Sequence, residues 1–383
     1  MAAITATGVG YGNIEAKRIV VDMANEIAFL EPSATPLVVL SKRMNTKSCA
    51  NPKFEWMDNN LDVRWSANGT TAAVATATTI NLVTGGGAYF AAGDLVKVAA
   101  TGEVIQVTSV STDALTVVRS IGGTAAAEIV GAAKLLIIGN ASMQGSGAPA
   151  EKVIGVTPFF NYTQIFKTAF SVTNTLEATK LYGMKELARL RKNNGIVHAK
   201  TMEYAFLFGE KAIDTAGAQP ITYTGGILES LASNANNVSK TKASATESDL
   251  MGFCEKVFTY GGDSRTCLVS PDFLSWFVGL AGSKVQIIQA DKDKTYGLDL
   301  SRYLTPFGVL NFVMHPLLVQ GYAGHCIALA TEDLYYRPLS GRDTKLQTNV
   351  QLPDEDGVRD MYITEAGMEL RLPLKHGIFK LTA

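Results

Sequence analysis

The sequence predicts a mixed α+β protein built from several structural units, and three stretches of the chain support that prediction. Residues 158–173 alternate like a strand and lead into one helical pattern over 175–208. Residues 66–142 hold few charges, many β-branched residues and frequent turn dipeptides. Residues 246–330 alternate helix and strand patterns. Together these stretches predict a long helix flanked by strands, a small all-β region and an α/β region.

Composition narrows the class of protein. The chain has 383 residues, which is enough for two or three structural units. Its net charge of −1 implies no general attraction to nucleic acid or membranes. Charged residues make up only 18%, below the usual quarter. A surface with so few charges has two explanations. Neighbouring subunits cover much of it, or the protein is an ordinary globular protein rich in Ala and Gly.

Neither an export signal nor a membrane span is expected. The first residues lack a basic segment followed by an apolar one, and no apolar run approaches the length of a bilayer span. The four cysteines show no CxxC spacing, so we expect reduced thiols in a protein made in the cytoplasm.

Residues 1–48 are predicted to form an arm with one helix over 14–30, capped by Asn13 and ending before Pro32. Residues 51–65 alternate Phe and Trp with charged neighbours, as one limb of a long hairpin would.

The low-charge region is predicted to be a small β-barrel or sandwich inserted into that hairpin. Turns are expected at Gly93-Asp94, Thr101-Gly102 and 111–113. The expected strands are 74–83, 94–100, 103–110, 114–119 and 134–138.

The helix over 175–208 would be roughly 50 Å long. Asn174 and Glu177 have capping-box spacing at its start, and Gly209 follows its last residue. Gly183 and Gly195 weaken it by up to about 1 kcal/mol each, so packing against neighbours must help to hold it.

The remaining chain is predicted to be a loop, an α/β region and a β-rich tail. Residues 210–245 are rich in Gly, Ser and Asn and are expected to be an exposed loop. The expected helices are 246–260 and 271–281; the expected strands are 265–270, 284–289, 308–314 and 325–330, with three or four more in 331–383.

A search for chemistry predicts no catalytic residue, metal site or cofactor. The four histidines lie outside any HExxH pattern, and no GxSxG nucleophile elbow occurs. Residues 354–356 are acidic and are either a cation site or, more simply, a solvated hairpin tip. We therefore expect a protein that is not an enzyme.

One charge pattern supports a binding hypothesis. At 100° per residue, one stripe of the predicted helix carries Lys185, Arg189, Lys192 and Lys200. The stripe could face DNA, or it could form salt bridges and be solvated.

The order of parts resembles the major capsid proteins of tailed phages with the Hong Kong 97-type fold, in the branch whose extended loop carries an inserted β-domain. The resemblance covers nearly the whole chain. The matching stretches are EPSATPLVVLSKR (31–43), FEWMDNNL (54–61), the insert from FAAGDLVKV (90–98) to VTSVSTDALTVVRSIGGTAA (107–126), NASMQGS (140–146) and NYTQIFKTAFSVTNT (161–175).

The resemblance implies an N-terminal arm, an extended loop, a peripheral domain with a spine helix, and an axial domain. The implied ranges are 1–48 for the arm, 49–156 for the loop with its insert at 67–141, 157–224 with 336–383 for the peripheral domain with spine helix 175–208, and 225–335 for the axial domain.

It also implies a function by assembly into hexamers and pentamers that close an icosahedral shell around double-stranded DNA. Implied partners are other copies of the chain, a separate scaffolding protein, a portal, a decoration protein and weakly held DNA, with no membrane. The implied location is the virion, after assembly in the host bacterial cytoplasm. Candidate contacts between subunits are Leu37, Leu40, Phe54, Trp56 and Trp65.

Two alternatives stay open. An encapsulin-like nanocompartment shares the implied fold and would enclose an enzyme instead of a genome. A β-rich adhesin or surface protein belongs to another class and should carry an export signal.

Overall fold

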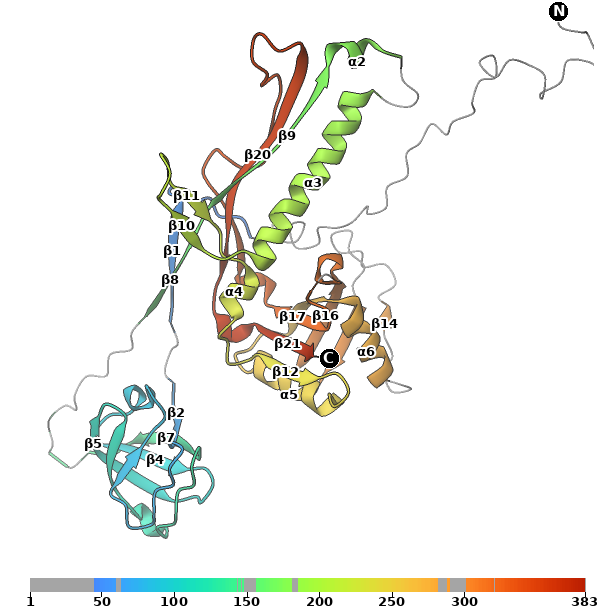
Figure 1. Cartoon of the computed structure of the whole chain (residues 1–383). Coiled ribbons are helices and arrows are strands. Elements are labelled where there is room, and N and C mark those ends of the chain that lie inside the picture. The colour runs from blue at the N-terminus through green and yellow to red at the C-terminus, as the bar shows by residue number, and fades with distance from the viewer. Residues whose placement is uncertain are drawn as a thin grey trace, which may run out of the picture. The chain divides into compact units, whose positions relative to one another are not determined.

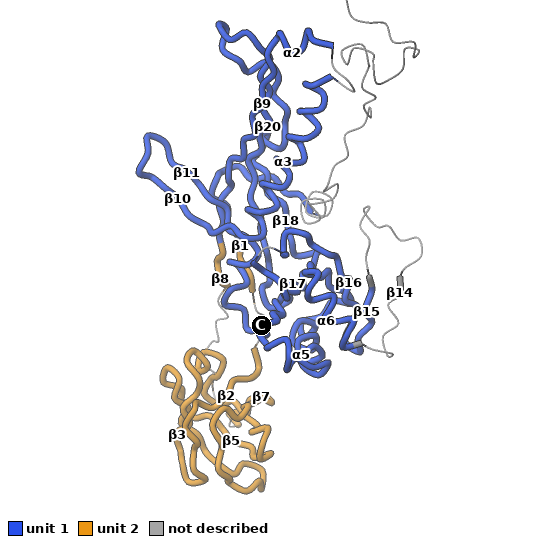
Figure 2. Tube along the Cα trace, turned by 45° about the vertical axis from the view of Figure 1, so that its right-hand side comes forward, with its two compact units in different colours: residues 1–56, 160–383 blue, residues 57–159 orange. Residues whose placement is uncertain are grey.

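The computed structural model describes residues 45–59, 63–142, 144–145, 147, 156–180, 185–281, 288–289, 301–319 and 321–382. The chain divides into two compact units, one of residues 57–159 and one of residues 1–56 and 160–383 (Figure 2). The smaller unit therefore interrupts the larger one in the sequence. The helix expected over 14–30 lies outside the described residues, as do Leu37 and Leu40.

The smaller unit is a closed six-stranded barrel. Its strands are β2 (Trp65–Ala67), β3 (Thr79–Asn81), β4 (Asp94–Val98), β5 (Val104–Ser111), β6 (Ala114–Val118) and β7 (Lys134–Asn140). They pair antiparallel in the order β2-β7-β4-β5-β6-β3. A bridge between Asn68 and Leu82 joins the two outer strands, with a 2.7 Å hydrogen bond from Gly69 N to Asn81 O. Because the sheet closes on itself, this unit is a barrel and not a sandwich.

Local signals place the barrel strands where the sequence predicts them. Gly93, Gly102 and Thr112 have positive φ angles at the three expected turns. Alternate residues point inward, and the fully buried side chains include Ile80, Val96, Ile105, Leu115 and Leu135. The strand expected over 74–83 is shorter, since a turn from Val74 O to Ala77 N precedes β3.

The limbs on either side of this unit in the sequence pair with each other. β1 (Lys53–Asp58) and β8 (Thr157–Tyr162) form a two-stranded sheet. Phe54 is buried where its neighbours Lys53 and Glu55 are exposed, as the alternation over 51–65 predicts. The residues that enter and leave the barrel therefore lie side by side.

A four-stranded sheet is built around one long strand. Its strands are β9 (Gln164–Thr173), β18 (Leu334–Pro338), β19 (Lys345–Gln347) and β20 (Gly357–Leu370). β20 pairs antiparallel with each of the other three. The segment before β1 runs parallel to β18 through bridges from Thr46 to Tyr336 and from Cys49 to Leu339.

The prediction of one helix over 175–208 was wrong, because the structure has two helices there. They are α2 (Asn174–Ala178) and α3 (Glu186–Phe208). Thr179 is extended at the end of α2, and its hydroxyl donates a 2.7 Å hydrogen bond to Thr175 O, one of the carbonyls that a helix end leaves without a partner. The observed α3 has 23 residues, and its end before Gly209 is as predicted.

The cap of the first helix also differs from the prediction. Thr173 caps α2 by accepting a 3.4 Å hydrogen bond from Leu176 N. Asn174 is the first helical residue, and its amide donates to Asp356 Oδ1 at 2.5 Å. The side chain of Asn174 thus binds Asp356, far along the chain, and does not cap the helix as the capping-box pattern predicted.

Helix α3 lies along the β9–β20 pair (Figure 1). Its second half enters the core through Met202, Phe206 and Leu207, which meet Phe166 of β9 and Tyr336 of β18. Its first half contains no fully buried residue between Glu186 and Val197. The helix is therefore anchored at its end and lies on a thin ribbon at its start.

A seven-stranded mixed sheet forms the other layer of the larger unit. Its strands are β12 (Val238–Thr241), β13 (Ser264–Val269), β14 (Ile288–Gln289), β15 (Ser301–Thr305), β16 (Gly308–Met314), β17 (His325–Leu329) and β21 (Gly377–Thr382), in the order β12-β21-β17-β13-β16-β15-β14. The helices α5 (Glu247–Phe258) and α6 (Pro271–Ala281) match their predictions. Phe253, Phe273 and Phe379 are packed in the core between helices and sheet.

The seven-stranded sheet corrects the assignment of the whole tail 336–383 to the unit of α3. β21 lies between β12 and β17, parallel to the first and antiparallel to the second. Phe379 on this strand is fully buried against Phe253 of α5. Hydrophobic packing thus draws the last strand into the sheet that the sequence assigned to 225–335 alone.

The prediction of an exposed loop over 210–245 was also wrong, because this range has regular structure. It contains the hairpin β10 (Ala212–Asp214) and β11 (Ile221–Tyr223), helix α4 (Ile227–Leu231), and β12. Ile227 and Leu231 lie four residues apart, so they share one face of α4 and enter the core below α3. Their apolar spacing was hidden by the Gly, Ser and Asn around it.

Candidate functional site

The features of the described residues that bear on function are one pocket, two buried polar joints and several exposed surfaces. Among the described residues, no group of His, Cys, Asp and Glu side chains could hold a metal ion. No helix in the described part of the chain has both the length and the apolarity needed to cross a bilayer.

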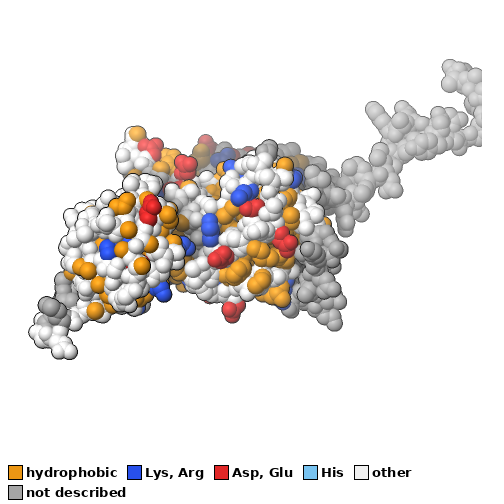
Figure 3. Space-filling model, turned by 90° about the horizontal axis from the view of Figure 1, so that it is seen from below, with side chains coloured by type: hydrophobic (Ala, Val, Ile, Leu, Met, Phe, Trp, Pro, Cys, Tyr) orange, Lys and Arg blue, Asp and Glu red, His pale blue; other side chains and the backbone are white. Residues whose placement is uncertain are grey.

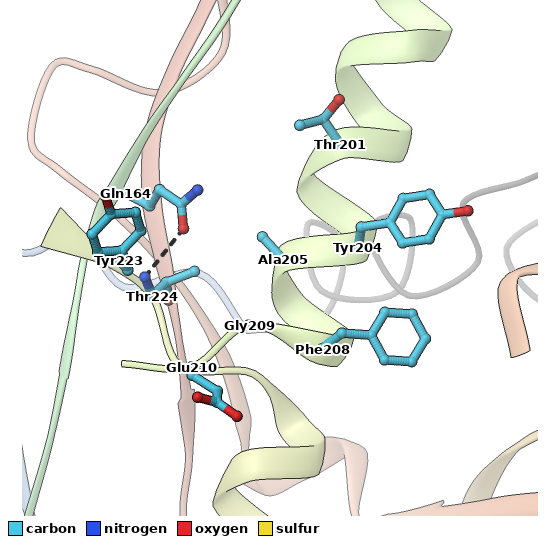
Figure 4. A pocket seen from close by; sticks show the side chains of 9 residues that line it. All are labelled: Gln164, Thr201, Tyr204, Ala205, Phe208, Gly209, Glu210, Tyr223 and Thr224. Carbon is cyan, nitrogen blue, oxygen red and sulfur yellow. Dashed lines mark hydrogen bonds between the residues drawn. The ribbon is translucent and has the colours of Figure 1, made fainter. Parts of the chain in front are cut away.

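One shallow pocket lies where α3 meets β9 and β11. Its volume is about 370 Å³. Figure 4 shows Tyr204 and Phe208 pointing away from Gln164 and Tyr223. The amide oxygen of Gln164 already accepts a 3.2 Å hydrogen bond from Thr224 N. The lining side chains thus do not converge on a common point, as acid–base or nucleophilic chemistry would require.

Polar contacts hold α3 to the ribbon where apolar burial is thin. His198 hydrogen-bonds to Thr168 of β9 at 3.0 Å and to Thr364 of β20 at 2.8 Å. About two turns earlier, Arg191 donates a 2.7 Å hydrogen bond to the buried carboxylate of Asp360. Both strands therefore hold α3 in place against the ribbon.

A buried pair joins α3 to the seven-stranded sheet. Glu203 Oε1 lies 2.6 Å from Nε2 of His315, and both side chains are fully buried. Leu317 N donates to Nδ1 of His315 at 3.3 Å, so Nε2 carries the proton that His315 donates to Glu203. Removing either partner would take a hydrogen bond from a fully buried polar group, so this pair joins helix and sheet firmly.

A second joint surrounds Asn161 at the end of β8. Its amide donates to Gly225 O at 3.0 Å and to Met368 O at 2.7 Å. Its carbonyl accepts from Gly225 N at 2.7 Å. One side chain thus ties the returning limb of the hairpin to β20 and to the start of α4.

The structure shows two of the four stripe residues in ion pairs with neighbouring acids. Lys185 Nζ lies 3.3 Å from Glu177 Oε1, with a strongly exposed side chain. Arg189 pairs with Glu186 one turn away, and this pair raises the pKa of Arg189. Lys192 and Lys200 lie further along α3, exposed and half-buried respectively. Local acids therefore offset part of the positive charge of the stripe.

The candidate contact residues fall into different environments. Phe54 is 5% exposed and lies under the guanidinium of Arg337, 5.1 Å from its ring centre. Trp56 stacks on Phe54 at 6.1 Å. Trp65 is 47% exposed on the barrel. Phe54 is thus occupied within its own chain, whereas Trp65 presents its ring to the outside.

Apolar side chains are also exposed elsewhere, and Figure 3 shows them scattered among uncharged side chains on one face. In the barrel they include Trp65, Val118, Leu136 and Ile138. Near the end of the β9–β20 ribbon they include Val350 and Leu352. The sequence search missed this last group because the acidic run beside it suggested a solvated tip.

Comparison with known proteins places these surfaces in context. The family model described as SU10 major capsid protein matches residues 3–383. The major capsid protein of Pseudomonas phage PaMx41 is 34% identical over 133 residues, which cover 34% of this chain and 32% of that protein. The matched segment therefore spans about a third of the relative's length.

Solved structures are similar at the level of the fold. One from Mycobacterium phage Bobi aligns with a TM-score of 0.50 at 10% identity, over 96% of this chain and 97% of that one. One from Microbacterium phage Oxtober96 aligns with a TM-score of 0.50 at 8% identity, over 96% of both chains.

Proposed function

The chain belongs to the family of SU10 major capsid proteins, and from that premise we propose that it is the main shell protein of a tailed double-stranded DNA phage. Copies of the chain would assemble as hexamers and pentamers and close an icosahedral shell around the genome. The observation that carries the proposal is the family match over residues 3–383. The role is structural rather than enzymatic, which membership of a capsid family supports.

The joints described above suit this role. A shell subunit has to keep its conformation while it contacts neighbouring subunits on several sides. Asn161 and the Glu203–His315 pair tie hairpin, helix and sheets together through buried hydrogen bonds. The exposed apolar side chains would then be buried between copies, where the hydrophobic term favours assembly.

Further partners belong to the same proposal. A separate scaffolding protein would guide assembly in the host bacterial cytoplasm, a portal would occupy one vertex, and a decoration protein could bind the finished shell. The peripheral and axial domains would correspond to the units around α3 and around the seven-stranded sheet, with β21 in the second. The barrel would be an insert in the extended loop.

The test is negative-stain electron microscopy of the expressed protein, with its scaffolding protein supplied. We expect closed shells of uniform size. Double-stranded DNA inside native particles would separate a phage capsid from a nanocompartment that encloses an enzyme. A chain that stays monomeric at high concentration with scaffold present would contradict the proposal.

The stripe on α3 gives a second expectation, that it contacts packaged DNA. We expect Lys185→Gln, Arg189→Gln and Lys192→Gln together to lower DNA retention in salt-washed particles about two- to fivefold. Each phosphate contact contributes about 0.9 to the slope of log affinity against log salt concentration, so losing contacts weakens DNA binding. The effect should be modest, since Glu177 and Glu186 already offset two of the charges.

The matched control is Lys242→Gln, a lysine of the larger unit that pairs with Asp272 away from α3. Particle yield and melting temperature should stay at wild-type values in both proteins. DNA retention equal to wild type in the triple variant would show that the stripe serves salt bridges and solvation instead.

A further inference from the structure

The outer face of the barrel carries an apolar patch with a basic rim. Trp65 on β2 pairs directly with Leu136 on β7, and Ile138 follows two residues later on the same face. Their exposed fractions are 47%, 45% and 46%. We call these three residues the Trp65 patch. Closely spaced apolar residues of this size on the outside of a barrel are typical of an interaction site.

Lysines flank this patch on both sides. Lys97 of β4 pairs with Leu136 in the sheet, so it lies across from Trp65. Lys134 lies two residues before Leu136, and its ammonium is 5.3 Å from the Trp65 ring centre. The one acid on strands β2, β4 and β7 is Asp94, which accepts a 2.8 Å hydrogen bond from Ala91 N. The patch therefore presents apolar surface with positive charge at its edge.

The loop between β19 and β20 has the opposite character. We call residues 350–356 the acidic tip. Leu352 is 65% exposed and Val350 is 41% exposed. Asp354, Glu355 and Asp356 follow directly, and Arg359 pairs with Glu355 at 2.7 Å. Apolar and acidic side chains thus stand together on one short loop.

Hydrogen bonds give this loop a defined shape. Val350 N donates to Arg359 O at 2.8 Å, and Asn349 N donates to Asp360 Oδ1 at 3.1 Å. Asn174 of α2 donates to Asp356 at 2.5 Å. A loop held in this way loses little conformational freedom on binding, so its exposed leucine is available at low entropic cost.

We propose that the Trp65 patch of one subunit docks on the acidic tip of a second copy of this chain. The inference rests on the proposed function, which requires copies to bind one another. Leu352 and Val350 would pack on Trp65, Leu136 and Ile138, while Asp354 and Glu355 would face Lys97 and Lys134. Tryptophan is the residue type most often found at the energetic centre of such contacts.

The contact is heterologous, because it joins two different surfaces. The first subunit then still has a free tip and the second a free patch, so the contact can repeat from copy to copy and close into rings. An isologous contact would stop at a dimer. A contact that repeats from copy to copy suits a shell, and it would give the barrel a role in assembly.

Crosslinking between two separate variants tests the geometry. All four native cysteines are buried, so Leu136→Cys and Leu352→Cys add accessible thiols one at a time. The two proteins are mixed before assembly and treated with a mild copper(II) oxidant, which takes up the two electrons of the new disulfide. We expect covalent dimers in the mixture and at least tenfold fewer in either variant alone.

Val118→Cys mixed with Leu352→Cys is the matched control, because Val118 is equally exposed on another strand of the barrel. It should give no more dimer than the single variants. A chain with both Leu136→Cys and Leu352→Cys that crosslinks only within itself would overturn the proposal, since the contact would then be intramolecular.

A charge exchange tests the chemistry. Lys97→Glu with Lys134→Glu should lower the yield of closed shells about tenfold, and adding Asp354→Lys with Glu355→Lys should restore it. Normal shells from the first variant would overturn this contact but leave the proposed function standing. Failure of the wild-type chain to form shells would instead contradict the proposed function itself.

Discussion

Replacing Arg119 by methionine is expected to unfold the barrel while the larger unit stays folded. Arg119 donates two 2.7 Å hydrogen bonds to the carboxylate of Glu103. It also donates to the carbonyls of Val74 and Ala77 in one turn and to that of Ala127, and so joins four segments of the barrel. Its loss would leave the carboxylate of Glu103 buried without its charged partner. Breaking such a pair typically costs about 3–5 kcal/mol.

The same pair gives the barrel a pH dependence with a definite sign. Arg119 lowers the pKa of Glu103 below its usual value, against the opposing effect of burial. A carboxyl whose pKa is lower in the folded state adds stability above the unfolded pKa, near 4.3. That stability is lost as the pH falls through the folded pKa. In Arg119→Met the buried acid has no cation, so protonation should stabilise the barrel and reverse the sign.

Hydrogen exchange on the whole chain measures both effects. Amides of β5 and β6 should lose protection in Arg119→Met at neutral pH, while those of β13 and β17 keep it. The control is Glu103→Met combined with Arg119→Met, which removes both charges and should recover much of the loss. Equal protection of the barrel in wild type and Arg119→Met would contradict the assigned role.

Replacing Arg265 by methionine should destabilise the seven-stranded sheet by about 3–4 kcal/mol. Arg265 is 1% exposed, at the start of β13. Its guanidinium donates to Ser264 O at 2.9 Å, to Lys375 O at 3.1 Å and to Val257 O at 3.2 Å, and it also reaches Gly261 O. Methionine fills similar space but donates nothing, so these carbonyls would be left unsatisfied.

Urea unfolding followed by exchange at α5 and β13 would measure this loss. Lys242→Met is the control, because its exposed ion pair with Asp272 should be worth less than about 1 kcal/mol. A loss in Arg265→Met no larger than in Lys242→Met would show that water replaces the guanidinium at no cost.

The family and the Hong Kong 97-type α+β fold were predicted from the sequence, and the family match and the aligned structures confirm them. Elements with local signals were also predicted well. The barrel turns carry Gly93 and Gly102 at positive φ, and Thr246 with Asp249 forms a full capping box at α5. Such signals act within a few residues, so a linear pattern contains them.

Features that depend on distant contacts were not predictable. The side chain of Asn174, which the sequence assigned to a helix cap, donates instead to Asp356, which lies far along the chain. β21 joins its sheet by pairing with β12 and β17. The residues of β21 alone do not indicate which strands it will pair with. Phe54 was proposed as a contact between subunits, but within its own chain it already packs under the guanidinium of Arg337. Phe54, Trp56 and Trp65 are the candidate contacts that the structure describes, and of these three only Trp65 has close to half of its area exposed.

The place of β21 has a consequence for synthesis on the ribosome. This strand is translated after every other described strand, yet it lies between β12 and β17 in the finished sheet. A nascent or truncated chain therefore has two unpaired strand edges and an uncovered Phe253. The sheet cannot be completed, and the subunit cannot reach its final shape, until this strand has left the ribosome. A chain that ends before this strand therefore differs from a finished one by the open edges of β12 and β17.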